Sequence, residues 1–518
     1  MNKIFFFFLI TLSGAPVWPQ SSKPAFIRQI KIVRENVFSQ TSEMPFYSRW
    51  ANAAHIVTRE RVIRRDLLFR EGDILQPDLL EESERKLRRL PFLGKAKVSF
   101  QPVSADSVDV VVTTQDQWST MLQPLLESGG GRTEIGVTAQ EFNLLGAGKL
   151  FLAEAFNQPE GTTLLFSYDD PQLIGSRWTL SGNLIAGPIQ EAITINLTRP
   201  FFASDTKWAW NGFYSNIDFT QREFSNGQES NAFTIKSQNA QFSLSRAFGR
   251  RFQKKKVQFS YRFQNRDFRR IQGRTSALSQ EDQLIHALTL TVSRENLNFR
   301  KERKVDRFLK TEDIVLGSHS AIAFGRTGLP FPVGIKRFEL TISQRQAYAI
   351  AQKQYLILNG SYQSLFDQDQ ILSFQLRYYN KHFPHQTLAL NVAANYSWNL
   401  EQGKQFLLGG DNGLRGYSAR QFAGDRRFLL NFEDRFFSNI EILTVALGGV
   451  MFIDAGQIWN EGQSFSMHDI NVSAGFGLRM GFTKSPRSRV GRLDLAIPIN
   501  NTGGFGLYIG VDQIFSID

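Results

Sequence analysis

The chain has 518 residues, among them 46 phenylalanines, 40 glycines and no cysteine, and its formal net charge is +12. The absence of cysteine excludes disulfides, thiol catalysis and cysteine-ligated metals. The mean hydropathy is slightly negative, so the aromatic residues do not belong to long apolar helices. This composition is typical of many amphipathic strands separated by polar turns.

The first segment, MNKIFFFFLITLSGAPVWPQSS, has one lysine, an apolar run from Ile4 to about Leu12, and then small and polar residues. This is the pattern of a secretory signal peptide, and the run is shorter than the about 20 apolar residues that cross a bilayer. A buried N-terminal strand or helix is the alternative. We predict a signal peptide over residues 1–21 and an exported chain without a transmembrane helix.

Residues 26–116 have a mixed pattern. FIRQIKIV reads as a strand, TRERVIRRDLLF and QPDLLEESERKLRRL have helical spacing, and AKVSFQPV and VDVVVTTQ alternate with a period of two. Pro77 stands where the first turn of a helix tolerates proline. The order strand, helix, helix, strand, strand predicts a small α/β domain.

After Trp118 the pattern has a period of two, as in KVQFSYRF, ILSFQLRYY and TLALNVAANYSW. Alternation alone also fits a soluble β-sandwich, which has one wet face and one dry face. The repetition over about 400 residues, in roughly nineteen runs, favours a closed barrel with a polar lumen and a lipid-facing exterior.

Part of the positive charge is concentrated between Arg250 and Lys310, in GRRFQKKK and FRKERKVDRFLK. Nucleic-acid binding is one interpretation of such clusters. Behind an export signal, loops that face anionic lipid headgroups are a better interpretation, and ordinary solvated loops without a ligand are a better one still. We therefore expect no nucleic-acid partner.

The C-terminal third carries several motifs in a fixed order: GLRGY (413–417), NFEDRF, MFIDAGQIW (451–459), GFGLRM, RLDLAIPI and the terminal FGLYIGVDQIF. With VIRRDLLFREGDIL and LLEESERKLRRLPFLGKAKV ahead of them, the sequence resembles the outer-membrane protein assembly factor and bacterial surface antigen superfamily. That family joins polypeptide-transport-associated (POTRA) domains to a sixteen-stranded barrel. The resemblance implies a mainly β fold, with one POTRA domain over residues 26–116 and a transmembrane antiparallel barrel of 16 strands over residues 119–518.

The sequence departs from this family pattern in two places. Only one POTRA domain fits ahead of the barrel, with a long insertion from about Glu35 to Val57 after its first strand. The number of alternating runs also exceeds sixteen. A run such as Ile314 to Phe324 would then be a hairpin outside the barrel wall.

The motif GLRGY contains one cation, Arg415, among glycines. Alternation on the neighbouring strands turns a set of charged side chains toward the lumen: Glu433, Arg435, Asp454, Arg479, Arg492 and Asp494. An arginine can make two-pronged contacts with a carboxylate that lysine cannot reproduce. We predict that Arg415 pairs with Asp454 or Glu433, and that Gly413 and Gly416 let the loop turn tightly and approach the wall. A solvated Arg415 on an extracellular loop is the alternative.

The resemblance implies the same placement, since the family's loop motif, which here includes Gly416 and Tyr417, docks inside the barrel. The lumen-wall partners are then Asp454, Glu433, Arg479 and Asp494, and the loop is held as an internal latch.

The last run, GFGLYIGVDQIF, must pair with the first strand, near Ser119 to Ser128, to close the barrel. Alternation places Gly510 inside and Phe515 outside. In the family this seam is proposed to open sideways toward lipid, so Gly510 and Phe515 are candidate seam residues. A strand glycine without a gating role is the alternative for Gly510, since glycine weakens side-chain packing wherever it stands in a strand.

We expect no enzymatic activity, no catalytic residue, no cofactor and no metal site. The histidines are scattered except for His382 and His385 in the turn HFPH, and two imidazoles without a third ligand make a poor metal site. GFGLRMG lies inside a strand and opens no helix, which argues against a nucleotide-binding loop.

The resemblance implies an outer-membrane protein, with its POTRA domain in the periplasm, that assists the insertion, assembly or translocation of polypeptides. Its partners would be unfolded outer-membrane or secreted polypeptides, outer-membrane lipids, and periplasmic or lipoprotein subunits. Clients would bind by β-augmentation at the strand edge from Lys95 to Val103. A two-partner-secretion transporter or a pore without insertase activity is the alternative, and a barrel with a purely structural role is a third.

Overall fold

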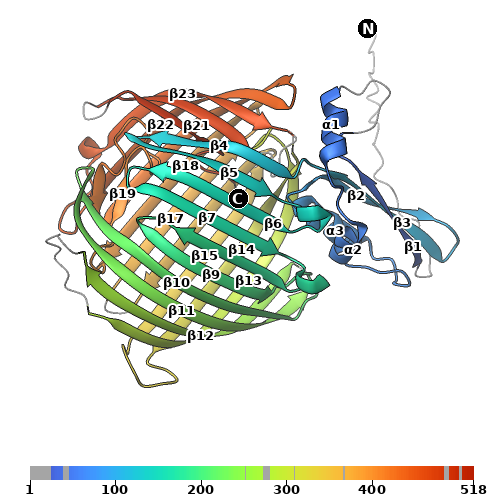
Figure 1. Cartoon of the computed structure of the whole chain (residues 1–518), viewed down its shortest axis with the longest axis horizontal. Helices are drawn as coiled ribbons and strands as arrows, with labels where there is room; N and C mark the ends of the chain where they lie inside the picture. Colours follow the sequence, from blue (N-terminus) through green and yellow to red (C-terminus); the bar gives the residue numbers. More distant parts are fainter. Residues whose placement is uncertain are drawn as a thin grey trace, which may run out of the picture.

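The computed structural model describes residues 25–38, 46–250, 252–271, 281–308, 310–365, 368–483, 489–500 and 504–517. The predicted signal peptide lies outside the described residues. The described chain forms a closed β-barrel with a smaller α/β unit at one of its ends (Figure 1).

The α/β unit contains β1 (Phe26–Glu35), α1 (Phe46–Ala54), α2 (Glu60–Asp66), α3 (Pro77–Arg89), β2 (Leu93–Pro102) and β3 (Ser107–Asp116). Its sheet has the order β1-β3-β2, with β1 parallel and β2 antiparallel to β3. Helix α3 begins at Pro77 and buries Leu80 and Leu87 in a core shared with the sheet. None of the helices in the described ranges is long and apolar enough to cross a membrane.

The predicted insertion after β1 contains helix α1. Trp50 on this helix stacks on Trp118, with ring centroids 6.2 Å apart, and the side-chain amide of Asn52 donates to the carbonyl of Phe38. No helix was expected in this insertion, because α1 has only nine residues and most of its described side chains are at least partly exposed, which leaves no apolar stripe in the sequence.

The barrel strands are β4 (Thr120–Gly129), β5 (Arg132–Glu141), β6 (Leu150–Gln158), β7 (Gly161–Asp170), β8 (Thr179–Ala186), β9 (Gln190–Arg199), β10 (Trp208–Ser225), β11 (Gln228–Arg250), β12 (Gln253–Arg270), β13 (Gln283–Glu302), β14 (Glu312–Thr327), β15 (Phe338–Ala351), β16 (Gln354–Ser364), β17 (Gln370–Asn380), β18 (Gln386–Trp398), β21 (Arg426–Ile442), β22 (Val445–Trp459), β23 (Asn471–Phe482), β24 (Val490–Pro498) and β25 (Gly506–Val511). Each pairs with its neighbours in chain order, and β25 closes the barrel on β4.

The barrel therefore has twenty strands, and the expected count of sixteen is wrong. The run from Ile314 to Phe324, which the lower count left outside the wall, lies in β14 and pairs with both β13 and β15. The roughly nineteen alternating runs in the sequence are closer to the observed number of strands than the sixteen of the family pattern. The reason is that each wall strand has one apolar face for the exterior and one polar face for the lumen.

The side-chain alternation along the wall separates an apolar exterior from a polar lumen. Around Asp454 on β22, Met451 and Ile453 are exposed on the outside, whereas Asp454 is fully buried within. The same alternation repeats on β21, β23 and β24. Large apolar residues exposed on the exterior are those a lipid environment requires.

The seam between β25 and β4 is the weakest junction of the barrel. Ile509 and Ser128 form the one paired position between these two strands, whereas β25 pairs with β24 at six positions. Strand β25 is also the shortest of the barrel strands, with six residues. Few backbone hydrogen bonds therefore hold the two ends of the sheet together.

The prediction that Phe515 faces the exterior at the seam is wrong. The strand ends at Val511, Asp512 takes a left-handed conformation (φ 66°), and the chain turns into the lumen. Phe515 is buried there beside Tyr355 and Tyr379. Alternation predicts which side of the wall a side chain faces only within a strand, and Phe515 lies beyond the end of β25.

The C-terminal tail is held in the lumen by buried polar contacts. The carboxylate of Asp306, in the loop between β13 and β14, accepts a hydrogen bond from the backbone N–H of Ile517 (2.7 Å). Arg435 donates to the carbonyl of Phe515 (2.8 Å) and to Asp306 (2.7 Å). The tail thus occupies the end of the lumen nearest the α/β unit.

Candidate functional site in the barrel lumen

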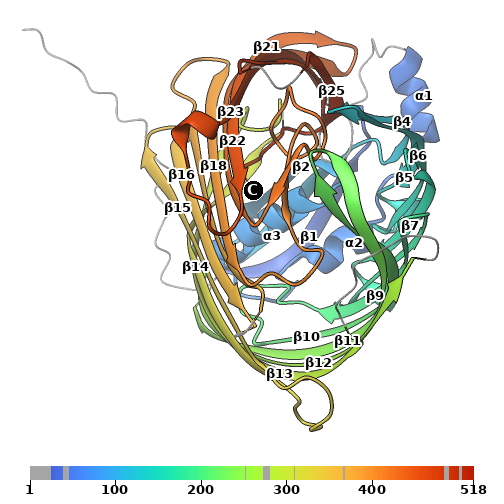
Figure 2. The same ribbon diagram turned by 90° about the vertical axis from the view of Figure 1, so that its left-hand side faces the viewer.

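The segment between β18 and β21 folds into the barrel instead of extending away from it. Figure 2, viewed from the end opposite the α/β unit, shows this orange segment inside the ring of strands. Two short strands, β19 (Phe406–Leu408) and β20 (Phe422–Gly424), pair with each other and carry residues 409–421, here called the lumen loop. The GLRGY motif lies in this loop.

Arg415, in the lumen loop, is completely buried and contacts three carboxylates. Its Nε and Nη2 atoms donate to the two oxygens of Asp454 at 2.7 and 2.9 Å, which is the two-pronged geometry expected of arginine. Its Nη1 atom lies 3.0 Å from Asp494 and 3.1 Å from Glu433. The prediction that Arg415 pairs with Asp454 or Glu433 named these as alternatives, whereas Arg415 contacts both, and it also contacts Asp494, which the resemblance placed among the lumen-wall partners.

Three further arginines surround the carboxylates. Arg435 donates from Nε to Glu433 at 2.8 Å, and Arg479 donates to Asp494. Arg492 lies farther away, with its Nη1 3.7 Å from Asp494. A buried carboxylate is tolerated only when it is paired and hydrogen-bonded, and each of these three carboxylates has at least two arginines within ion-pair distance or is held by the two-pronged contact with Arg415.

The guanidinium of Arg415 also lies against an aromatic ring. Its central carbon is 3.3 Å from the centroid of the Phe452 ring on β22. Asn431 donates from its side-chain amide to both Asp454 (2.8 Å) and the carbonyl of Gly413 (2.7 Å), which fixes the carboxylate and the loop backbone together. A planar, weakly hydrated cation fits this site, and a lysine ammonium would reproduce neither the fork nor the stacking.

The two motif glycines occupy positions that other residues cannot. Gly413 and Gly416 have φ values of 98° and 90°. A Cβ atom on Gly413 would lie 2.9 Å from a methyl carbon of Leu429, and one on Gly416 would lie 3.1 Å from Cβ of Ser473. The loop therefore needs glycine at both positions, for its backbone conformation and for its close approach to the wall.

The lumen loop contacts both sides of the seam. The hydroxyl of Tyr508, on β25, accepts a hydrogen bond from the N–H of Gly416 (2.6 Å) and donates to the carbonyl of Tyr417 (3.2 Å). On the other side, the N–H of Ala419 donates to the carbonyl of Gly130, in the turn that joins β4 to β5 (2.7 Å). The loop thus bridges two strands that have a single paired position between them.

Sequence reasoning missed Tyr508. The signal was present, because Tyr508 has the same parity as the inward-facing Gly510, and Gly506, two residues before it, leaves room beside its ring. Gly510 itself faces inward, where an added Cβ would lie 3.0 Å from Nε of Arg492. Its place is therefore against the arginine network and not on the outer face of the seam.

Replacing Tyr508 with phenylalanine should loosen the lumen loop. The change leaves the buried N–H of Gly416 without its acceptor, at a cost of about 1–3 kcal/mol. We expect amide hydrogen exchange in residues 409–421 to become about tenfold faster or more. Tyr348→Phe, on the exposed surface of β15, is the matched control. Unchanged exchange in the Tyr508 variant would contradict the bridging role.

The site has the geometry of an anchoring network. Its three carboxylates are all engaged by arginines, and within the described ranges no group of three or more histidine or acidic side chains is arranged to hold a metal ion. The predicted residues Arg415, Glu433, Asp454, Arg479 and Asp494 meet in one cluster. Tyr417 points away from it, with its hydroxyl 2.8 Å from the side-chain oxygen of Asn500.

Comparisons with known proteins address the C-terminal part of the chain most directly. Residues 338–515 match the model of the Omp85 superfamily domain. No curated protein sequence matches the chain closely enough to count as a relative.

Several solved structures align with most of the chain at low sequence identity. BamA from Haemophilus ducreyi lacking POTRA domains 1-3 is 14% identical, with a TM-score of 0.38 over 94% of this chain and 84% of that one. CdiB from Acinetobacter baumannii is 13% identical (TM-score 0.47, 95% and 74% covered), and CdiB from Escherichia coli is 11% identical (TM-score 0.49, 94% and 76% covered). The match over residues 338–515 thus identifies an Omp85 superfamily domain in the C-terminal part of the chain, which includes the lumen loop and the strands that carry Glu433, Asp454 and Asp494.

Proposed function

We propose that the protein assists the insertion, assembly or translocation of polypeptides at the outer membrane, and that its clients leave or enter through the seam. The observation that carries this proposal is the junction of β25 with β4, which has one paired position. A client strand could pair with either free edge, because unpaired backbone groups at a sheet edge template further strands.

The lumen loop would regulate this opening. It holds Tyr508 on one side of the seam and Gly130 on the other, while Arg415 fixes the loop to β22 and β24. Opening the seam therefore requires the loop to release at least one of these contacts. The arginine network sets the stability of the closed state.

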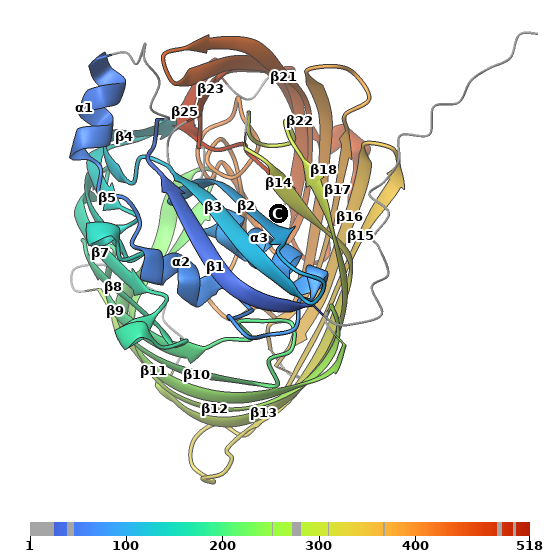
Figure 3. The ribbon, with the colours of Figure 1, turned by 90° about the vertical axis from the view of Figure 1, so that its right-hand side faces the viewer.

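We infer that residues 26–116 form a periplasmic POTRA domain that receives extended clients. In Figure 3 the sheet of this unit lies across the end of the barrel. Strand β2 is an edge of the sheet β1-β3-β2, and a cavity of about 580 Å³ lies beside it, between Gly94–Lys97 and the barrel residues Lys310 and Thr311. The N–H of Val98 on this edge donates to Glu84 of α3, so a client strand that paired there would displace Glu84.

A secretion transporter or an axial pore is the alternative function. The contents of the lumen favour the seam over a permanently open axial path, since the lumen loop fills one part of the barrel and the C-terminal tail occupies the end near the α/β unit. The free energy for insertion would come from the folding of the client and from the burial of its apolar face in lipid.

Reconstitution into liposomes tests this proposal. We expect the protein to speed the folding of an added, urea-unfolded outer-membrane barrel. Folding is measured as the fraction of the client that migrates as a folded barrel on a gel when the sample is not heated. Liposomes that contain a barrel of similar size from outside the superfamily are the control. Steady ion conductance without any effect on the client would support a pore instead.

A further inference from the structure

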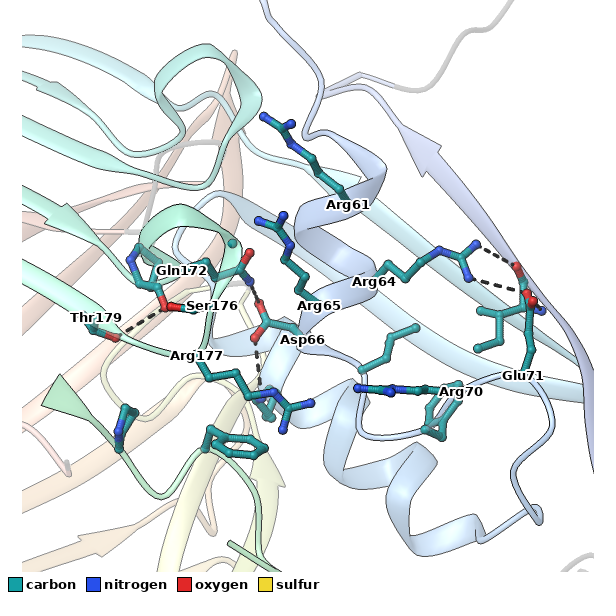
Figure 4. A pocket seen from close by; sticks show the side chains of 18 residues that line it. Arg61, Arg64, Arg65, Asp66, Arg70, Glu71, Gln172, Ser176, Arg177 and Thr179 are labelled. Carbon is teal, nitrogen blue, oxygen red and sulfur yellow. Dashed lines mark hydrogen bonds and ion pairs between the residues drawn. The ribbon is translucent and has the colours of Figure 1, made fainter. Parts of the chain in front are cut away.

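A cavity of about 770 Å³ lies where the α/β unit meets the barrel. Its walls come from α2 and the loop after it, from the turn between β7 and β8, and from the segment between β9 and β10. Figure 4 shows side chains from both parts of the chain converging on it. The cavity lies at the ends of β7 and β9 that face the α/β unit.

The lining is strongly basic. Six lining side chains are cationic and two, Asp66 and Glu71, are acidic. Both acidic groups are already engaged: Glu71 lies 3.5 Å from Arg64, and Asp66 lies 3.5 Å from Lys86. Within the described part of the chain, the other four cations have no carboxylate at ion-pair distance: Arg61, Arg65, Arg70 and Arg177.

Two of these four arginines face each other across the junction. In Figure 4 the guanidinium groups of Arg70, from the α/β unit, and Arg177, from the barrel turn, point toward one another. Arg177 is held in place by the ring of Phe202, whose centroid is 3.7 Å from its central guanidinium carbon. Burial and the positive charge of Arg70 lower the pKa of Arg177 from its ordinary value, although the carboxylates of Asp205 and Asp66 act in the opposite direction.

Such a like-charge pair is unfavourable unless an anion lies between its members. Guanidinium groups bind phosphate through two parallel hydrogen bonds each, and they do so most strongly in partly desolvated sites. The cavity also presents apolar surface from Phe69, Pro200 and Phe202. The site thus suits a ligand that has a phosphate group next to an uncharged portion.

We propose that this cavity binds a phosphate-bearing anion, held between Arg70 and Arg177. Because Arg70 belongs to the α/β unit and Arg177 to the barrel, the ligand would fix the orientation of the unit relative to the barrel end. The phosphate could be supplied by a lipid headgroup, which the position at the ends of β7 and β9 allows, or by free phosphate. The proposal does not depend on the function proposed for the seam.

Binding to the full-length protein in a phosphate-free detergent tests the proposal. The probes are dihexanoyl phosphatidylglycerol, inorganic phosphate, and hexaglutamate as an acidic peptide, each titrated by calorimetry. The variants are Arg70→Gln with Arg177→Gln, and Arg70→Lys with Arg177→Lys; Arg269→Gln, an exposed arginine at the other end of the barrel, is the matched control. Heat-dependent gel mobility shows whether each variant is folded.

We expect the glutamine pair to weaken binding of a phosphate-bearing probe about tenfold or more, the lysine pair to have an intermediate effect, and the control to bind like the parent. Tighter binding of the phospholipid than of inorganic phosphate would assign the site to a lipid headgroup, and the reverse order would assign it to free phosphate. Equal binding by all folded variants, or binding of hexaglutamate alone, would overturn the proposal.

Discussion

Replacing Arg415 with alanine is expected to destabilise the folded barrel by about 3–5 kcal/mol, because the change leaves buried carboxylates without their shared cation. Asp454 loses both prongs of its contact, and Asp494 and Glu433 each lose one partner. The lumen loop should leave the wall. Its release can be measured as trypsin cleavage after Arg420 in the folded protein, and the loss of stability as a lower temperature of the heat-induced mobility shift.

Arg415→Lys separates charge from geometry. The ammonium restores the positive charge but provides neither the fork to Asp454 nor the stacking on Phe452, so we expect about 1–3 kcal/mol of destabilisation. Arg420→Lys is the matched control, because this arginine lies in the same loop but is partly exposed and pairs with Asp411 at 3.3 Å. If Arg415→Lys resembled both the parent and this control, the loop would not depend on its buried arginine.

The wall of the site was predictable from the sequence because strands impose a strict period of two. Asp454, Glu433 and Asp494 were assigned to the lumen by alternation alone, and all three are buried there. The sequence could not rank them as partners of Arg415, because alternation gives the direction of a side chain but not the depth at which a loop residue enters the barrel. The structure brings all three to the same guanidinium.

Other features escaped prediction for different physical reasons. Phe515 was misplaced because the strand ends at Val511, and nothing in a local pattern shows where buried contacts with Asp306 and Arg435 take over from sheet pairing. The cavity between Arg70 and Arg177 joins residues more than a hundred positions apart. Such long-range contacts depend on how two folded units pack, and periodicity carries no information about that packing.

A covalent lock between β25 and β4 should block the client folding that we propose for the seam. The chain has no cysteine, so Ser128→Cys with Ile509→Cys introduces the only thiols and can form one disulfide. Opposed residues on antiparallel strands have Cα atoms about 4.5–5.5 Å apart, within the range of about 4.4–6.8 Å that a disulfide requires. We expect oxidation to slow client folding in liposomes at least about tenfold, which corresponds to about 1.4 kcal/mol of barrier, and reduction to restore it.

The other side of the same strand provides the control. Ile509 pairs with Ser128 across the seam and with Leu493 on β24, so Leu493→Cys with Ile509→Cys locks β25 to a neighbour with which it already pairs at six positions. Both disulfides lie on the exterior and involve the same residue of β25, so they differ only in whether they cross the seam. Full activity of the oxidised seam variant would show that clients do not pass between β25 and β4. Equal inhibition by both disulfides would show that mobility of β25 itself, and not separation of the seam, limits the reaction.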